Sequence, residues 1–210
     1  MRRFSSILGI FAVVVVGGCT AASPGEPIPV TTGKTAPAGT ESSSTDSGQK
    51  LPFAGAPKVS NPLDTNRFQQ DPCRSLTSEQ AQSLDFPPDG ESRDSTFGKA
   101  CTWSNRGSGG RATVHFLDED PRGLSAEYQA HDDGITALFE VLPPIEGYPA
   151  VVSNTIDGRP DGRCTVIVGV SDEIRFEVPL WLSQVNVGTK DPCDVAALVA
   201  GLALKTMKAG

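Results

Sequence analysis

Histidines, aromatic residues and the common catalytic motifs are scarce in this 210-residue chain, which has two histidines and 6% aromatic residues. It contains no Cys-x-x-Cys pair, no Gly-x-Ser-x-Gly sequence and no Asp-x-Asp-x-Asp-Gly loop. These absences argue against a zinc site, an α/β-hydrolase nucleophile and an EF-hand calcium site, respectively. No glycine-rich phosphate loop follows a predicted strand, so nucleotide binding has no support. We therefore predict no catalytic residues, no cofactor and no metal, and expect that the protein is not an enzyme.

A long apolar run is also missing, because the apolar stretch over residues 7–16 is too short to cross a bilayer as a mature helix. This stretch follows Arg2-Arg3 and ends at Val16-Gly17-Gly18-Cys19, the arrangement of a bacterial lipoprotein signal. We predict a signal peptide over residues 1–18 and lipidation of Cys19. The protein would then be exported and anchored by lipid on the outer face of the cell membrane. The alternative is a plain secretory signal with an incidental cysteine.

The charge balance is acidic, with 25 Asp and Glu against 18 Lys and Arg. Cleavage after residue 18 would remove two arginines and no acid, which leaves 16 basic residues and a net charge of −9. Such a surface disfavours nucleic acid and anionic head groups. We expect membrane association through the lipid on Cys19 alone, and no nucleic-acid partner.

Composition divides the rest of the chain into a tether and one domain. Residues 19–66 are rich in Pro, Gly, Ser, Thr and Ala and show no helical or alternating apolar pattern, which predicts a disordered tether behind the lipidated cysteine. Residues 67–210 have the composition of a single globular domain, large enough for one core. We expect a monomer.

The four cysteines of the predicted domain are Cys73, Cys101, Cys164 and Cys193. An even number of cysteines in an exported domain indicates disulfides, although four cysteines allow three pairings that the sequence alone does not distinguish. We favour Cys73–Cys101 with Cys164–Cys193, because each bond would join the start of a predicted helix to a nearby strand.

Periodicity predicts an α+β fold with a largely antiparallel sheet, about three helices and two disulfides. Asp-Pro-Cys occurs twice, and each copy precedes a predicted helix. The first of these helices starts at a Thr77–Gln80 capping box, and the second starts at Pro192 behind an Asp191 cap. The remaining predicted elements are a helix over 124–139, stopped by Pro143-Pro144, and strands over 101–104, 112–117, 150–153, 164–170 and 174–182.

Other candidate residues receive structural interpretations. We expect His115 to face solvent or a groove, and His131 to lie on a helix without a metal-ligand pattern. Ser108 lies in a predicted hairpin turn, which is a poor frame for a nucleophile. The acidic residues 118–120 and 132–133 are expected to be solvated. Trp181 falls on the opposite strand face from Phe176, and this face is where we would look for a partner or ligand.

Several motifs together resemble a known family. They are Asn61-Pro62-Leu63-Asp64, both Asp-Pro-Cys sequences, Cys101-Thr102-Trp103, Gly147-Tyr148-Pro149-Ala150 and Cys164-Thr165-Val166. In this order they resemble the actinobacterial lipoproteins of Domain of Unknown Function 3558. The resemblance implies an exported envelope protein and no established activity. It leaves three hypotheses: a binding or accessory module for an envelope protein, peptide or cell-wall component, which we favour; a carrier of lipid or another apolar ligand; and an enzyme of unrecognised type.

Overall fold

The computed structural model describes residues 49–210. The predicted signal peptide (1–18), the lipidation site Cys19 and the first part of the predicted tether lie outside the described residues, so they stay predictions.

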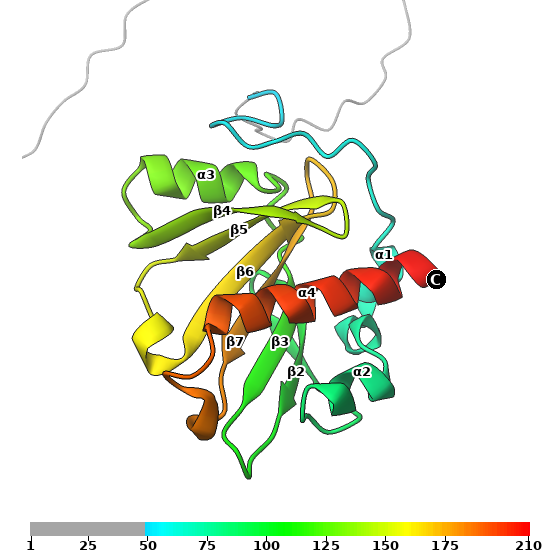
Figure 1. Ribbon diagram of the computed structural model, residues 1–210. Coiled ribbons are helices and arrows are strands. Elements are labelled where there is room, and N and C mark those ends of the chain that lie inside the picture. Colours follow the sequence, from blue (N-terminus) through cyan, green and yellow to red (C-terminus); the bar gives the residue numbers. More distant parts are fainter. Residues whose placement is uncertain (1–48) are drawn as a thin grey trace, which may run out of the picture. The chain divides into compact units, whose positions relative to one another are not determined.

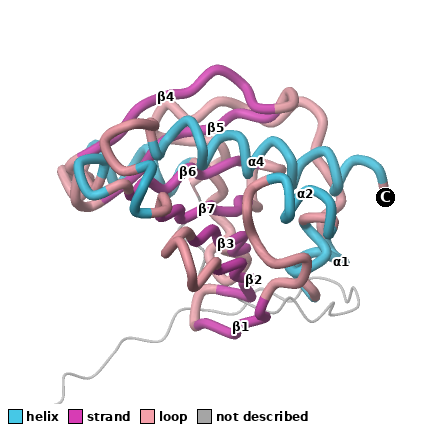
Figure 2. Tube along the Cα trace, turned by 60° about the horizontal axis from the view of Figure 1, so that its bottom comes forward, coloured by secondary structure: helices cyan, strands magenta, loops and turns pink. Residues whose placement is uncertain are grey.

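One sheet of seven strands organises the described part of the chain, and every neighbouring pair of strands is antiparallel. The strands are β1 (Glu91–Ser95), β2 (Gly98–Ser104), β3 (Arg111–Phe116), β4 (Leu138–Ile145), β5 (Tyr148–Asn154), β6 (Arg163–Gly169) and β7 (Arg175–Trp181). Figure 2 shows them following one another in the order β1-β2-β3-β7-β6-β5-β4. The α-helices are α1 (Asn66–Gln70), α2 (Ser78–Ser83), α3 (Ser125–Asp132) and α4 (Pro192–Ala209). The predicted α+β class, antiparallel sheet and two disulfides are confirmed.

The main core lies between the sheet and α4, which crosses one face of the strands (Figure 1). The buried side chains of α4 include Ala196, Val199, Ala203 and Leu204. Leu198, by contrast, is a large apolar residue of α4 that is 54% exposed. Small alanines form the centre of the interface because they let the helix approach the sheet closely, and a pattern of large apolar residues does not reveal them.

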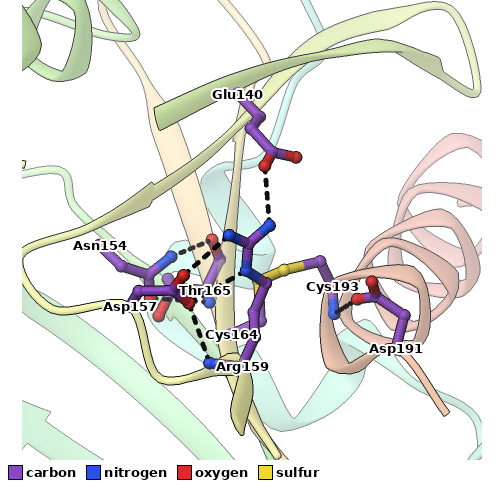
Figure 3. Close-up of a disulfide and its surroundings, with 8 residues drawn as sticks. All are labelled: Glu140, Asn154, Asp157, Arg159, Cys164, Thr165, Asp191 and Cys193. Carbon is purple, nitrogen blue, oxygen red and sulfur yellow. Dashed lines mark hydrogen bonds and ion pairs between the residues drawn. A yellow bond between two sulfur atoms is a disulfide. The ribbon is translucent and has the colours of Figure 1, made fainter. Parts of the chain in front are cut away.

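The two disulfides pair as predicted and fasten helical starts to the sheet. Cys73–Cys101 joins the 3₁₀ turn Pro72–Ser75 to β2, and Cys164–Cys193 joins β6 to the first turn of α4. Figure 3 shows the second bond beside the predicted Asp191 cap, whose carboxylate accepts a hydrogen bond of 2.7 Å from the Cys193 backbone N–H. The predicted Thr77–Gln80 capping box is also present at α2.

The predicted helix over 124–139 is wrong in its second half. α3 ends at Asp132, and Gly134 then adopts a left-handed backbone with φ of +70°. The chain continues into β4, where Pro143-Pro144 do not stop a helix but lie in an edge strand with an irregular register. An edge strand tolerates proline because one side of its backbone makes no ladder hydrogen bonds. Sequence reasoning also missed β1, whose five residues are all exposed and therefore show no apolar alternation.

Residues 49–66, which the predicted tether includes, pack in part onto the domain. Val59 and Ala56 are buried, and the Val59 backbone N–H donates a hydrogen bond of 2.8 Å to Asp172. The Phe53 backbone N–H similarly donates to the Ser125 hydroxyl at 2.9 Å. A few apolar side chains are enough to order this segment where the domain satisfies its backbone groups, although it forms no regular element before α1.

Candidate functional site

The two faces of the sheet differ in polarity. The face that packs against α4 is apolar, whereas on the opposite face α3 and its surroundings cover Val151 and Ile167 of β5 and β6. The remainder of that opposite face carries mainly polar side chains from several strands. We call it the open face and define it by Ser95, Thr102, Arg111, Thr113, His115, Arg163, Thr165, Glu177 and Trp181.

A row of arginine, tryptophan and arginine crosses one end of the open face. Trp181 of β7 stands directly opposite Arg111 of β3 on one side and Arg163 of β6 on the other. The Arg111 guanidinium carbon lies 3.9 Å from the centre of the Trp181 ring, as in a cation–π contact. Arg163 pairs with Asp161 at 2.8 Å, whereas Arg111 has no carboxylate within 4.0 Å among residues 49–210. The Arg111 guanidinium is therefore available to form an ion pair with a ligand.

A small cavity adjoins this row. It encloses about 220 Å³, and Trp181, Arg163, Thr165 and Asn154 are among its lining residues. Asn154 is held in place by two hydrogen bonds with the Thr165 backbone, which Figure 3 shows beside the disulfide. The row thus combines an aromatic surface, two cations and neutral polar groups.

A second polar group lies farther along β7, around the buried side chain of Arg175. Its guanidinium donates to Glu127 of α3 at 3.1 Å and to Asp120 at 3.0 Å, so it holds α3 and the loop after β3 against the sheet. Asp120 also accepts hydrogen bonds from Arg122, and these bonds, more than those from Arg175, hold the pKa of the Asp120 carboxyl at about 2. Every donor group of Arg175 has a partner within the protein. We therefore assign a structural role to Arg175.

His115 lies between these two groups. Its Nδ1 is 2.8 Å from Glu177 Oε1, and its Nε2 is 2.9 Å from the Ser95 hydroxyl. The predicted position of His115 in a groove is confirmed, because it lines a cavity of about 610 Å³. Sequence reasoning missed Ser95 and Glu177 as neighbours of His115. Alternation places His115 and Glu177 on polar strand faces, but only the register of β3 against β7 brings them opposite each other.

Comparison with known proteins gives one match. Residues 14–206 match the family described as protein of unknown function (DUF3558). The chain belongs to this family. No curated protein and no solved structure matches the chain. Membership in DUF3558 therefore confirms the family resemblance of the motifs and supplies no catalytic or binding residues.

His131 and Ser108, which were also singled out from the sequence of this DUF3558 chain, contact residues outside the set that defines the open face. His131 stacks on Phe139 with 4.4 Å between ring centres, and the Ser108 backbone oxygen accepts a hydrogen bond from Gln184. Within residues 49–210, no group of three or more His, Cys, Asp or Glu side chains could hold a metal ion. None of the helices in that part of the chain is long and apolar enough to cross a membrane.

Proposed function

We propose that the protein is an exported, lipid-anchored envelope lipoprotein that acts as a binding or accessory module, and that its open face holds the ligand. The observation that carries this proposal is the position of Trp181 between Arg111 and Arg163. Tryptophan and arginine are among the residue types that contribute most of the binding energy in protein recognition sites. The disulfides support export, because such bonds persist in oxidising compartments.

The chemistry of the row favours a ligand with an anionic group next to a flat or weakly polar surface. Arg111 would pair with a carboxylate or phosphate, while Trp181 would contact a ring or a peptide plane. A peptide, an envelope protein or an acidic cell-wall component fits this description. The cavity next to Trp181 has both apolar and polar residues in its lining, and its volume of about 220 Å³ is small for a ligand pocket, so it suits a small group better than a lipid chain.

Replacing Cys19 with Ala is expected to release the protein from the membrane into the soluble fraction. The physical reason is that an acidic domain has no electrostatic attraction to anionic head groups, so the acyl chains supply the anchoring energy. Fractionation of cells producing the variant, followed by immunoblotting, measures this effect. Trp181→Ala serves as the control and is expected to stay in the membrane fraction. Retention of the Cys19→Ala protein in membranes would contradict the lipid anchor.

Ligand capture is expected to occur from the open face and to depend on Trp181. A photo-crosslinking amino acid at Thr113, in the lipidated full-length protein, should capture a reproducible partner in intact envelopes. The same group at Val141, an exposed position on the far edge strand β4, is the matched control and should not capture it. Mass spectrometry of proteins, glycans and extracted lipids identifies the partner. Adding Trp181→Ala should reduce capture at least about tenfold, as loss of roughly 1.4 kcal/mol implies.

Equal capture from both positions, or capture that is unchanged by Trp181→Ala, would contradict the proposed binding face. Enrichment of a single lipid without protein or glycan would favour a lipid carrier instead.

A further inference from the structure

Three residues on the open face form a continuous chain of hydrogen bonds across β1, β3 and β7. The Ser95 hydroxyl lies 2.9 Å from His115 Nε2, and His115 Nδ1 lies 2.8 Å from Glu177 Oε1. The sheet fixes this chain because His115 stands directly opposite Glu177 on one side and opposite Ala100 of β2 on the other. Ser95 then reaches over β2 from the end of β1, where it pairs with Gly98.

The carboxylate determines which nitrogen of a neutral His115 carries the proton. An ionised Glu177 only accepts hydrogen bonds, so Nδ1 must donate and Nε2 is left as the acceptor. The Ser95 hydroxyl has two acceptors within reach, His115 Nε2 at 2.9 Å and the Gly98 carbonyl oxygen at 2.8 Å. When the hydroxyl turns towards Nε2, the arrangement is that of a nucleophile, a general base and an orienting carboxylate.

A cavity for a substrate adjoins this chain. It holds about 610 Å³ and is lined by Thr96, Phe97 and Leu117, by His115 and Glu177, and by charged residues around Arg175, whereas Ser95 borders it through its chain neighbour Thr96. Phe97 follows Ser95 by two residues and is 63% exposed, so it contributes little to the core. An exposed aromatic side chain beside a base and a hydroxyl gives an apolar group somewhere to bind. The side chains of His115 and Glu177 are 12% and 24% exposed, so both are shielded but reachable.

We propose that Ser95, His115 and Glu177 form a hydrolytic site that cleaves small esters with an apolar acyl group. This inference goes beyond ligand binding and departs from the expectation, drawn from missing motifs, that the protein is not an enzyme. For serine hydrolases, that expectation rested on the absence of Gly-x-Ser-x-Gly, whereas such triads are recognised by geometry and occur in unrelated folds.

The reaction would proceed in two balanced steps. Ser95 Oγ attacks the ester carbonyl carbon while its proton passes to His115 Nε2; the bond to the alcohol oxygen then breaks, and the alcohol leaves with that proton. The product of this step is an acyl-Ser95 ester. A water molecule next attacks the acyl carbon and gives its proton to His115, and the acid and the free Ser95 hydroxyl are released. Glu177 is a positioning residue, because it orients the ring and stabilises its protonated form without touching the substrate.

A covalent probe tests the nucleophile directly in the folded wild-type protein. A fluorophosphonate should react with Ser95, and peptide mapping should find the phosphonate on this residue. The wild-type protein should also hydrolyse p-nitrophenyl butyrate. The rate of this hydrolysis should be at least about 100-fold lower in the Ser95→Ala and His115→Gln variants than in the wild type. Ser92→Ala, on the same strand but on the opposite face, is the matched control and should leave hydrolysis unchanged.

The Glu177→Gln variant tests whether Glu177 orients the His115 ring for catalysis or only stabilises the fold. It should lower kcat with little change in KM, whereas Glu140→Gln, at a carboxylate on the far edge strand, should change neither. Absence of an adduct on Ser95, labelling that persists in His115→Gln, or hydrolysis retained by Ser95→Ala would overturn the proposal. These outcomes do not depend on ligand capture at Trp181. The proposal of a hydrolytic site and the proposal of a binding face can therefore be contradicted independently of each other.

Discussion

Replacing Cys164 and Cys193 together with Ala is expected to lower the free energy of unfolding by about 3–4 kcal/mol. The bond joins residues with a sequence separation of 29 and so restricts the conformations of the unfolded chain. Without the bond, the unfolded chain gains conformational entropy and becomes more favourable relative to the folded protein. Loss of the bond also releases the first turn of α4 from β6, and α4 supplies much of the side of the core that faces the sheet. Alanine leaves no thiol that could form a new disulfide with Cys73 or Cys101.

Equilibrium unfolding in urea measures the effect, provided that the slope of the transition stays comparable between variants. The double variant of Cys73 and Cys101 is the matched comparison, since its loop has a separation of 28 residues and should give a similar loss. If the free energy of unfolding fell by less than about 1 kcal/mol in either double variant, the loop-entropy explanation of disulfide stabilisation would be contradicted for that bond.

Replacing Arg175 with Met is expected to lower the free energy of unfolding by about 3–5 kcal/mol. Methionine roughly preserves the aliphatic stem of the side chain but removes the charge. The loss of stability therefore comes mainly from the carboxylates of Glu127 and Asp120, which lose their ion pair with Arg175. The Glu127 carboxylate is only 14% exposed and would lose its ion-pair partner at 3.1 Å. An uncompensated buried carboxylate loses hydration without gaining an ion pair, which is why breaking a buried pair costs more than the pair itself contributes.

Two companion variants isolate this effect. Adding Glu127→Gln to Arg175→Met should recover part of the lost stability, because the neutral amide pays a smaller desolvation cost. Arg122→Met tests a more exposed ion pair of Asp120, with the arginine side chain 49% exposed, and should cost no more than about 1 kcal/mol. If Arg175→Met proved no more harmful than Arg122→Met, the Arg175 cluster would not be holding α3 against the sheet.

Acid should weaken the same cluster. Hydrogen bonds from Arg122 and Arg175 depress the pKa of Asp120 from 3.8 to about 2 in the folded protein. A carboxyl with a depressed pKa stabilises the fold above its ordinary pKa and loses this contribution as the pH falls through the folded value. The contribution of Asp120 should therefore be present at neutral pH and disappear between about pH 4 and pH 2. Urea unfolding across this range should show a smaller loss for Asp120→Asn than for the wild type.

The fold class and the terminal helix could be predicted from local patterns, whereas the favoured cysteine pairing was one of three possibilities until the structure showed it. The second Asp-Pro-Cys sequence carries its own cap and first helical residue, and alternation in β3, β6 and β7 reflects burial of one strand face. Where such local signals were weak or conflicting, prediction failed. β1 is exposed on both faces, and β4 follows a helix-like run whose end is decided by the left-handed backbone of Gly134.

The candidate sites depended on tertiary structure to a greater degree. Alternation alone placed Trp181 on the face opposite Phe176, and this could be read from residue order within one strand. The neighbours of Trp181 and His115 come from other strands, and their identity depends on a register set by packing over the whole sheet. A shift of one residue would turn Glu177 to the other face and separate it from His115. The sequence by itself determined the family, the fold class and the terminal helix, because these follow from motif order and short-range patterns. Only the tertiary structure decided that Ser95, His115 and Glu177 meet, because their contact requires three strands to align at one register.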